Sequence, residues 1–399
     1  MTGSTQLLRS CPICNHVIAR DIHRGEYELP SEHLMPGQLN IVSCDFCGFC
    51  FTDTGASQAV YDLYYAEMSK YADARLSTGS GGTTADSCRL EDLASAICTG
   101  ALPREEDAVL DLGCGAGGLL DSLARCGLRN LWGLDPAPAC AAHVEKRGHN
   151  ARAGTIKTNS FRKNFFDGIV LSHVLEHVRD LSEALDCIKF ILKKDGWIYV
   201  EVPDAGRYLD CLIAPFQDFN LEHINHFSQK SLINLLSSCG FNTFASGAKT
   251  LDLEGGGSYP AVYAFARQGP VDRMLPDNTT GEKLLRYAVA SQAIIQRVNG
   301  HLRSLADSQV PVAVWGVGQL TMRLLRNSIL GQCNIAVFVD SNSMMQGKHM
   351  RGIPIVSPQM FGSRMSEVET LVVGSMVSNK AIVRSLADIG FDKPIMSFS

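Results

Sequence analysis

Residues 109–120, VLDLGCGAGGLL, constrain the fold of this chain more than any other feature. An apolar run leads into three glycines at alternate positions, Gly113, Gly115 and Gly117, and then into a second apolar stretch. Glycines let a backbone pass close to a ligand, and the first turn of a helix favours a polar or anionic group. The segment therefore predicts a strand, a tight loop and a helix that hold a ligand. The spacing is GxGxG rather than the dinucleotide form GxGxxG, so its context has to decide the ligand.

That context is an alternation of short apolar strands and helices over residues 86–270. The clearest strands are AVLDLGC, LWGLD, DGIVLS and WIYVEVPD. Such alternation predicts an α/β domain with a doubly wound parallel sheet and helices on both faces. Asp111 lies inside the first strand. Asp135 ends the next strand after the glycine loop, where a carboxylate can accept both hydroxyls of a ribose.

Residues 1–55 contain two CxxC pairs that lie well apart in the sequence, Cys11 with Cys14 and Cys44 with Cys47. Zinc takes four soft ligands in a tetrahedron, and each pair supplies two thiolates from one tight turn. Gly48 suits the left-handed turn of such a pair. Four thiolates leave no open position, so we expect a structural Zn²⁺ in a small zinc-binding module rather than a catalytic one. Four unrelated cysteines are the alternative, and Cys50 is a spare thiol.

The rest of the chain divides into three pieces. Residues 56–85 form a tyrosine-rich helix and a flexible linker, and residues 271–309 form a linker and a long amphipathic helix. Residues 310–399 restart the alternation with a GVG turn at Gly316 and an acid, Asp340, at the end of the second strand. This C-terminal domain is Rossmann-like but lacks the third glycine. An NAD site and a purely structural lid are both open for it.

Charge and hydropathy narrow the possible partners. The chain has 36 Lys and Arg against 41 Asp and Glu, a net charge of −5, which disfavours nucleic acid. No run approaches the ~18 apolar residues of a membrane span, and the N-terminus lacks the apolar core of a signal peptide. The 14 cysteines are too dilute for a disulfide scaffold. We therefore expect a cytoplasmic protein with thiols and metal ligands, and no membrane partner.

The glycine loop and its acids resemble the class I S-adenosylmethionine-dependent methyltransferases, whose first motif is the DLGCGxG of residues 111–117. The resemblance covers about residues 86–265. It implies that the three glycines face the methionine part of the cofactor and that Asp135 binds the ribose, with Asp111 beside them. The acid that many family members carry after the third strand is missing from AGTIKTNSF, so adenine recognition stays unassigned. Binding of NAD is the alternative.

Two polar clusters follow the fourth and fifth strands, where the acceptor of an α/β enzyme binds. The first is HVLEH, residues 173–177, and the second is EHINHFS, residues 222–228. Histidine suits proton transfer at neutral pH, and a neighbouring glutamate can orient it. Glu176 and His177 are equally compatible with a locally hydrogen-bonded helix start. His226 and Ser228 are also compatible with the start of the helix that SQKSLINLLSS forms.

The order of modules over the whole chain resembles the deoxysugar C-methyltransferases, which act on nucleotide-linked keto-sugars. This resemblance implies that a tyrosine before the core, a histidine after the fourth strand and a Glu-His pair line the sugar pocket. The matching residues here are Tyr65 or Tyr71, His177, Glu222 and His223. It also implies that the C-terminal domain holds the nucleotide. Ordinary amphipathic packing is the other role open to these tyrosines.

The implied mechanism is removal of the proton α to the sugar ketone by His223, followed by attack of the enolate carbon on the methyl group. Transfer to oxygen or nitrogen of a small sugar- or nucleotide-linked acceptor is the alternative. A zinc-containing RNA methyltransferase would need a basic groove, yet the basic residues are scattered. A non-catalytic assembly protein is disfavoured by the intact glycines. The Asn and second His of EHINHFS have no assigned role, and the oligomeric state stays open.

Overall fold

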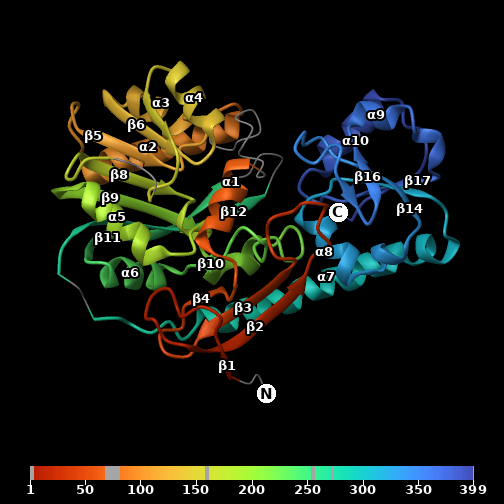
Figure 1. The fold of residues 1–399 in the computed structure, drawn as a ribbon, viewed down its shortest axis with the longest axis horizontal. Coiled ribbons are helices and arrows are strands. Elements are labelled where there is room, and N and C mark those ends of the chain that lie inside the picture. Colours follow the sequence, from red (N-terminus) through yellow and green to blue (C-terminus); the bar gives the residue numbers. More distant parts are fainter. Residues whose placement is uncertain (1–3, 68–80, 158–160, 253–256, 271–272, 399) are drawn as a thin grey trace. The chain divides into compact units, whose positions relative to one another are not determined.

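The computed structural model describes residues 4–67, 81–157, 161–252, 257–270 and 273–398. The chain divides into two compact units (Figure 1). The first comprises Met1–Asp21, Ile41–Cys211 and Glu222–Leu284, and the second comprises Ile22–Asn40, Leu212–Leu221 and Leu285–Ser399. Two short internal stretches thus belong with the C-terminal domain. Within the described residues, no helix combines the length and the apolar character needed to cross a bilayer.

The first unit is built on a seven-stranded sheet of order β11-β12-β9-β8-β5-β6-β7. Five strands are parallel, as the sequence predicts: β5 (Ala108–Leu112), β6 (Asn130–Asp135), β7 (Asn150–Ala153), β8 (Phe166–Ser172) and β9 (Leu192–Pro203). The other two, β11 (Phe241–Asp252) and β12 (Ser258–Gln268), are antiparallel, so the sheet is mixed rather than wholly parallel. Only residues 253–257 separate them, and a connection that short can join only antiparallel neighbours.

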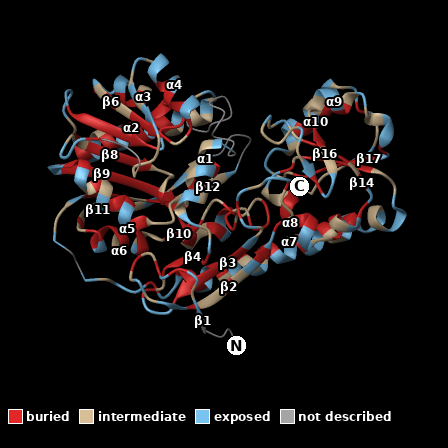
Figure 2. Cartoon of the chain, viewed as in Figure 1, coloured by how far each residue is buried: buried red, intermediate tan, exposed pale blue. Residues whose placement is uncertain are grey.

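Helices cover both faces of this sheet because alternate strand residues point to opposite sides (Figure 1). Leu110 of β5 lies in a core with α5 (Leu181–Ile191) and α6 (Gln229–Ser238). Its neighbour Val109 lies in a second core with α2 (Thr84–Ala101), α3 (Gly118–Arg125) and α4 (Pro138–Lys146). Buried residues fill most of the strands (Figure 2). The doubly wound arrangement positions the loops at the carboxyl ends of β5, β6, β8 and β9 together.

A second sheet, of order β1-β2-β3-β4-β10, involves the N-terminal residues. Its strands are β1 (Ser4–Gln6), β2 (Ile18–Glu26), β3 (Gln38–Cys44), β4 (Cys50–Thr52) and β10 (Asn225–His226). The two-residue strand β10 pairs with β4, so part of the EHINHFS segment is an edge strand. The tyrosine-rich helix is α1 (Gln58–Glu67). Single 3₁₀ segments follow β8 and β9, η2 (Leu175–His177) and η3 (Ala205–Cys211).

The C-terminal part contains a six-stranded sheet of order β15-β16-β14-β13-β17-β18. Its strands are β13 (Val312–Trp315), β14 (Ile335–Val339), β15 (His349–Met350), β16 (Ile353–Val356), β17 (Thr370–Val373) and β18 (Ile395–Met396). Its helices are α8 (Gln319–Asn327), α9 (Pro358–Gly362), α10 (Asn379–Asp388), η4 (Ile329–Gln332) and η5 (Met365–Glu367). Five of these strands are parallel, and their order, β16-β14-β13-β17-β18, corresponds to strands 3-2-1-4-5 of the dinucleotide-binding fold. The expected long helix is α7 (Thr280–Ser308).

Candidate active site

The glycine loop joins β5 to α3 at the carboxyl edge of the sheet. Gly113, Gly115 and Gly117 have φ of 78°, 49° and 84°, in the left-handed region where a side chain is strained. A Cβ on Gly113 would also lie 2.8 Å from Cγ2 of Val174, in the loop after β8. Gly117 caps α3 without a side-chain hydrogen bond. The loop is therefore a tight cradle, and it packs against the segment that follows β8.

Two buried carboxylates lie behind this loop. Asp135 accepts hydrogen bonds from the backbone N–H groups of Gly115 and Ala137, both at 2.9 Å. Asp111 is 4% exposed, and burial together with the charge of Asp135 raises its pKa to about 7. Buried acids with raised pKa values are typical of ligand-binding sites, because they cost stability until a ligand compensates them. A cofactor with a cationic group and ribose hydroxyls fits this pair.

The predicted acceptor residues from three separate segments come together. The Tyr65 hydroxyl, on α1, lies 2.7 Å from Nδ1 of His177, on η2. The same Nδ1 lies 3.0 Å from the carbonyl oxygen of Glu222. The ring centroids of His177 and His223 are 5.0 Å apart. Tyr71 lies outside the described residues, so its predicted role there stays a prediction. The structure thus places Tyr65, His177, Glu222 and His223 in one cluster.

Tyr64 also belongs to this cluster, although the sequence did not single it out. Its hydroxyl donates to Oε1 of Glu222 at 3.1 Å. Adjacent positions on a helix normally face different directions, so the sequence does not predict that Tyr64 and Tyr65 serve the same site. Tyr64 contacts the carboxylate of Glu222 directly. Tyr65 contacts His177, whose Nδ1 lies near the carbonyl oxygen of Glu222. Both tyrosines of α1 therefore help to position Glu222, one directly and one through His177.

Glu176 stands between two histidines. It is 1% exposed, and its Oε1 lies 3.1 Å from Nδ1 of His173 and 3.9 Å from Nε2 of His177. One side-chain atom each of Glu176, His177 and His223 lies within 4.8 Å of the others. The hydrogen bond of Glu176 to His173 is local, as the alternative of a locally bonded helix start predicts, whereas His177 contacts Tyr65 and the carbonyl of Glu222 in other segments.

A charged network extends from His173 into the sheet, and sequence analysis missed most of it. Nε2 of His173 lies 3.4 Å from Oε1 of Glu201, which is fully buried on β9. Oε2 of Glu201 forms an ion pair with Lys249 and accepts a hydrogen bond of 2.5 Å from the Tyr199 hydroxyl. Glu201 could have been found as the charge inside the apolar run WIYVEV, whereas nothing marks Lys249 before β11 is placed beside β12.

These contacts shift two pKa values in opposite directions. Burial alone would lower the pKa of His173, but its hydrogen bond to Glu176 and its charge interactions with Glu176 and Glu201 raise it to about 9. Burial alone would raise the pKa of Glu201, but His173 and Lys249 lower it to about 2. At neutral pH His173 is therefore an imidazolium ion beside the Glu201 carboxylate.

The Asn and second His of EHINHFS hold the backbone of the site. The Asn225 side-chain amide donates to the carbonyl oxygens of Leu175 and Val178, at 2.8 and 2.6 Å, and its oxygen accepts from Arg9 at 3.0 Å. His226 is fully buried, and burial followed by the charge of Arg9 lowers its pKa to about 3. Both residues are structural, since they fix η2 and the edge of the N-terminal sheet.

Ser228 caps α6 and confirms the helix start that the sequence allowed. Its hydroxyl accepts from the N–H of Ser231 at 3.1 Å, and the hydroxyl of Ser231 accepts from the N–H of Ser228 at 2.8 Å. This reciprocal pair is a capping box. The polar residues after β9 therefore divide in two, with Glu222 and His223 in the site and residues 225–228 in the scaffold.

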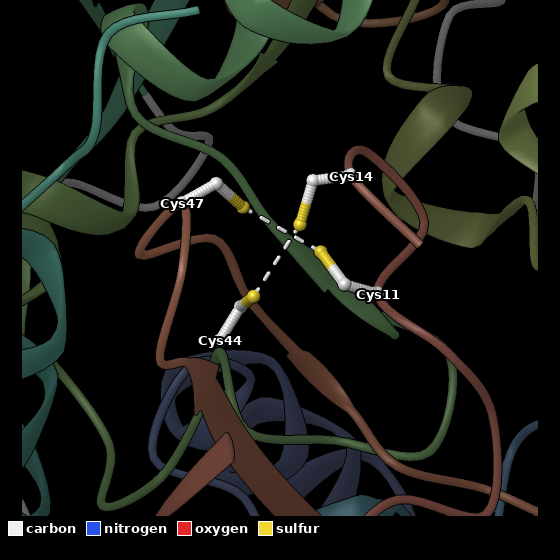
Figure 3. Close-up of side chains that lie close together, drawn as sticks. All are labelled: Cys11, Cys14, Cys44 and Cys47. Atoms are coloured by element: carbon white, nitrogen blue, oxygen red, sulfur yellow. Dashed lines mark hydrogen bonds between the residues drawn. The ribbon is translucent and has the colours of Figure 1, made fainter. Parts of the chain in front are cut away.

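The four predicted metal ligands converge from the two CxxC turns (Figure 3). The Sγ atoms of Cys11 and Cys47 are 3.6 Å apart, those of Cys14 and Cys44 are 3.5 Å apart, and all four lie within 4.8 Å of one another. Gly48 has a φ of 76°, and a Cβ there would lie 1.9 Å from the carbonyl oxygen of Asp277. Cys50 donates to the carbonyl of Gly48 instead. The quartet fits a tetrahedral zinc ion in its donor atoms and spacing.

Comparison with known proteins identifies the domain built on the seven-stranded sheet of the first unit. Residues 88–246 match the family model described as a methyltransferase domain. This chain contains an S-adenosylmethionine-dependent methyltransferase domain. The C-methyltransferase NovU of Streptomyces niveus is 26% identical over 289 residues, covering 67% of this chain and 66% of that protein. The ubiquinone biosynthesis O-methyltransferase of Methylocella silvestris is 36% identical over 103 residues, covering 24% of this chain and 40% of that protein.

These alignments span less than two thirds of the length of either relative. A solved structure, the 1,6-didemethyltoxoflavin-N1-methyltransferase of Burkholderia thailandensis with bound S-adenosylhomocysteine, aligns with a TM-score of 0.41 and 20% identity. It covers 58% of this chain and 96% of that structure. The match to the methyltransferase domain model covers residues 88–246, in the middle of the chain.

Proposed function

We propose that the methyltransferase domain transfers a methyl group from S-adenosylmethionine to a carbon atom of a nucleotide-linked keto-deoxysugar. The observation that carries the proposal is the cluster of Tyr65, His177, Glu222 and His223 beside the loop that packs on Gly113. Hydroxyl, imidazole and carboxylate groups suit a polar acceptor that must lose a proton. The alignment with NovU, named a C-methyltransferase, supports it because that alignment covers 67% of this chain and so is longer than the domain match alone.

The cofactor-binding residues fit the expected ligand. Asp135 would accept the ribose hydroxyls, and the three glycines of the loop would border the methionine part, with Asp111 opposite its ammonium group. When bound, S-adenosylmethionine supplies an electrophilic methyl group on a sulfonium ion. The protein's task is then to align the acceptor carbon with that methyl group and to remove a proton. Asp111 and Asp135 would bind the cofactor, and the histidines of the acceptor cluster would take part in proton removal.

His223 is the proposed base. It takes the proton from the carbon next to the sugar ketone, and the electron pair of that C–H bond moves onto the ketone oxygen to give an enolate. With the cofactor bound, the enolate carbon would form the new C–C bond as the bond from sulfur to the methyl group breaks, which re-forms the ketone and leaves S-adenosylhomocysteine as the neutral leaving group. The proton on His223 then leaves to solvent. Glu222, His177 and Tyr65 orient the acceptor and the base through the contacts described above.

The cysteine quartet is proposed to hold a structural Zn²⁺. Four thiolates satisfy zinc completely and let a segment with a small core fold by binding metal. We expect purified protein to contain one equivalent of zinc and Cys44→Ser to lose it, whereas Cys50→Ser, the matched control, keeps it. Elemental analysis measures both. Full zinc retention in Cys44→Ser would contradict the assignment.

The C-terminal unit is proposed to bind the nucleotide part of the substrate. Its Gly316 turn and the Asp340 carboxylate support this, because both occur where Rossmann-like folds hold nucleotides. The proposed partner is therefore a small molecule, a nucleoside-diphosphate sugar, and not nucleic acid or a membrane. Arg351, one of the basic residues of this unit, is bound to Glu28 and to two backbone carbonyls and is better suited to a structural role.

Calorimetry tests the proposal first. Purified protein is titrated with S-adenosylhomocysteine and then with a panel of nucleoside diphosphates. Binding of both, with one diphosphate preferred, supports a nucleotide-linked acceptor. Binding of S-adenosylhomocysteine without any diphosphate contradicts the sugar-nucleotide part. Failure to bind S-adenosylhomocysteine contradicts the enzyme assignment itself.

Turnover then tests the chemistry. The acceptors are thymidine-, uridine-, guanosine- and cytidine-diphosphate 4-keto-6-deoxyhexoses, and the product is examined by NMR. We expect a methyl group on carbon, and loss of turnover by ~10²-fold or more in His223→Asn with cofactor binding kept. His301→Gln, an exposed change on α7, is the matched control. Undiminished turnover in His223→Asn would eliminate the proposed base.

Transfer to oxygen is the second candidate. The relative from Methylocella silvestris, 36% identical over 103 residues, is named an O-methyltransferase. An O-methyl product in the same NMR experiment would favour this candidate, because methyl protons on oxygen and on carbon differ widely in chemical shift. An O-methyltransferase would also need the acceptor hydroxyl, rather than a ketone, beside His223, so reduced sugars would then be better substrates than keto-sugars.

A further inference from the structure

The proposed mechanism leaves the negative charge of the enolate oxygen without a named partner. We propose that His173 is an additional catalytic residue, which donates a hydrogen bond from Nε2 to the acceptor oxygen as it gains charge. The inference rests on the proposed function, since it concerns the same acceptor. In this step His223 takes the α proton, the electron pair of the C–H bond moves to the oxygen, and His173 keeps its own proton throughout.

The first argument is the balance of charge. Glu176 and Glu201 are 1% and 0% exposed, and Lys249 supplies one positive charge to them. With His173 and His177 both neutral, one negative charge would be left uncompensated in the interior, which is costly. Of these two histidines, His173 lies nearer Glu176, at 3.1 against 3.9 Å, and it also contacts Glu201. A protonated His173 balances the group. The two carboxylates therefore keep a cation at this place, and Tyr199 satisfies Glu201 further without adding charge.

The second argument is the direction of the ring nitrogens. Nδ1 of His173 is hydrogen-bonded to Oε1 of Glu176 at 3.1 Å. Nε2 lies 3.4 Å from Oε1 of Glu201, but that oxygen accepts no hydrogen bond among the described residues. The contact is an ion pair without a directed bond. The Nε2–H group therefore retains its capacity to donate, whereas Nδ1 is committed to holding the ring.

The third argument is position. His173 directly follows β8, and its neighbour Val174 packs against the site of Gly113 in the cofactor loop. Its φ of 57° is unfavourable for a residue with a Cβ, by roughly 1 kcal/mol. Its side chain remains 25% exposed although both carboxylates around it are buried. A strained, charged and partly exposed residue beside the cofactor loop is placed for a ligand rather than for the core.

The groups around His173 set the expected pH dependence. They are Glu176 from η2, Glu201 and Tyr199 from β9, Lys249 from β11 and Tyr259 from β12, whose ring centroid lies 6.2 Å away. The carboxylates raise the pKa of His173 to about 9. Turnover should therefore fall as pH rises through about 9, because His173 then loses a ring proton and with it its positive charge.

The kinetic test compares three variants with the wild-type protein, using the nucleotide-linked 4-keto-6-deoxyhexose that is turned over. We expect kcat to fall by ~10²-fold in His173→Gln, as when one oxyanion donor is removed. Glu176→Gln should move the alkaline limb of the pH profile to lower pH, and His301→Gln should change neither. The dissociation constant of S-adenosylhomocysteine should stay within about twofold in all three. A kcat within twofold of wild type in His173→Gln would overturn the role of His173 and leave the proposed function standing.

A measurement without acceptor separates the two hypotheses. Histidine side chains labelled with ¹³C are titrated by NMR, and His173 is assigned by its missing signal in His173→Gln. We expect it to titrate near pH 9 in the wild-type protein and lower in Glu176→Gln. Titration near the ordinary value for histidine would overturn the inference whatever the kinetics. Absence of wild-type turnover with every keto-sugar would instead overturn the proposed function, and the role of His173 with it.

Discussion

The chain contains two glycine turns of the same design, one in the methyltransferase domain and one in the C-terminal unit. Asp135, at the end of β6, accepts from the N–H groups of Gly115 and Ala137. Asp340, after β14, accepts in the same way from Val317 and Asn342, at 2.6 and 2.8 Å. In both, an acid after the second strand fastens the turn after the first. In both units the acid therefore also fixes the geometry of the turn.

The two turns differ in what they leave buried and strained. Two residues before the first glycine, the methyltransferase domain has the buried acid Asp111 and the C-terminal unit has the buried apolar Val314. The first turn holds three glycines with positive φ, whereas Gly318 has a φ of −87°. A buried acid costs stability, so Asp111, rather than the acid after the second strand, is the feature that distinguishes the turn of the methyltransferase domain from that of the C-terminal unit.

The largest expected effect concerns Asp111. Its pKa is about 7 in the folded chain and near 3.9 when unfolded, so the folded state binds the extra proton between these values. Stability contributed by that proton is full below pH 4 and is lost as pH rises through 7, by up to about 4 kcal/mol. Asp111→Asn should remove this loss.

Urea unfolding without cofactor at pH 5 and pH 8 measures this effect. The difference between the two pH values should shrink in Asp111→Asn, and Val314→Asp should introduce a similar loss into the C-terminal unit. Equal pH dependence in the wild-type protein and Asp111→Asn would show that Asp111 is not the group responsible.

Adding a side chain to the glycines gives the next largest effect. Gly113→Val would place a Cβ 2.8 Å from Val174 in a left-handed backbone, so we expect S-adenosylhomocysteine to bind at least ~100-fold more weakly. Gly318→Val should leave that affinity unchanged, because a Cβ there meets nothing within 4 Å and φ is ordinary. Calorimetric titration with S-adenosylhomocysteine compares the two variants. Equal losses of affinity would contradict the assignment of cofactor binding to the first turn alone.

Neutralising the matched acids gives a smaller effect. Asp135→Asn removes the charge that would accept the ribose hydroxyls, and a charge-assisted hydrogen bond is worth ~1.5–3 kcal/mol, or at least ~10-fold in affinity. Asp340→Asn should not change the affinity for S-adenosylhomocysteine. The same titration measures both variants. A loss of affinity in Asp340→Asn would mean that the C-terminal turn contributes to cofactor binding.

The smallest expected effect is on stability and comes from a substitution in the C-terminal turn. Gly318 is the N-cap of α8 and has no side chain to accept from the helix. Gly318→Ser should stabilise the protein by a few tenths of a kcal/mol, since serine caps slightly better than glycine. Chemical denaturation monitored by tryptophan fluorescence measures this, because Trp315 is buried in that unit. Destabilisation would indicate that the turn needs a bare backbone there.

Much of the fold could be predicted because its signals are local. The strands of the methyltransferase domain, the helix α7 and the C-terminal α/β unit all follow from periodicity and from glycine-rich turns. The antiparallel strands β11 and β12 could not be assigned to the sheet edge, because strand direction depends on pairing with β9. The grouping of residues 22–40 and 212–221 with the C-terminal unit likewise depends on long-range packing.

The candidate site was predictable where residue types cluster in the sequence. HVLEH and EHINHFS pointed to His177, Glu222 and His223, and the CxxC pairs pointed to the thiols. The roles within a cluster were less accessible, since Asn225 and His226 are scaffold while Glu222, just before them, contacts Tyr64. Spacing in the sequence cannot separate these roles, because Asn225 and His226 become scaffold by forming β10, which pairs with the distant strand β4.

The sequence by itself determined the α/β class, the glycine turn after β5 and the two CxxC turns, because each depends on neighbours within a short stretch of chain. Only the tertiary structure decided that Glu176 and Glu201 enclose His173 and that Lys249 balances them. These four groups come from β11, β9 and the segment after β8, which are far apart in the sequence. Electrostatic interaction acts through space, so the charge state of His173 is fixed by strand order rather than by the residues beside it in the sequence.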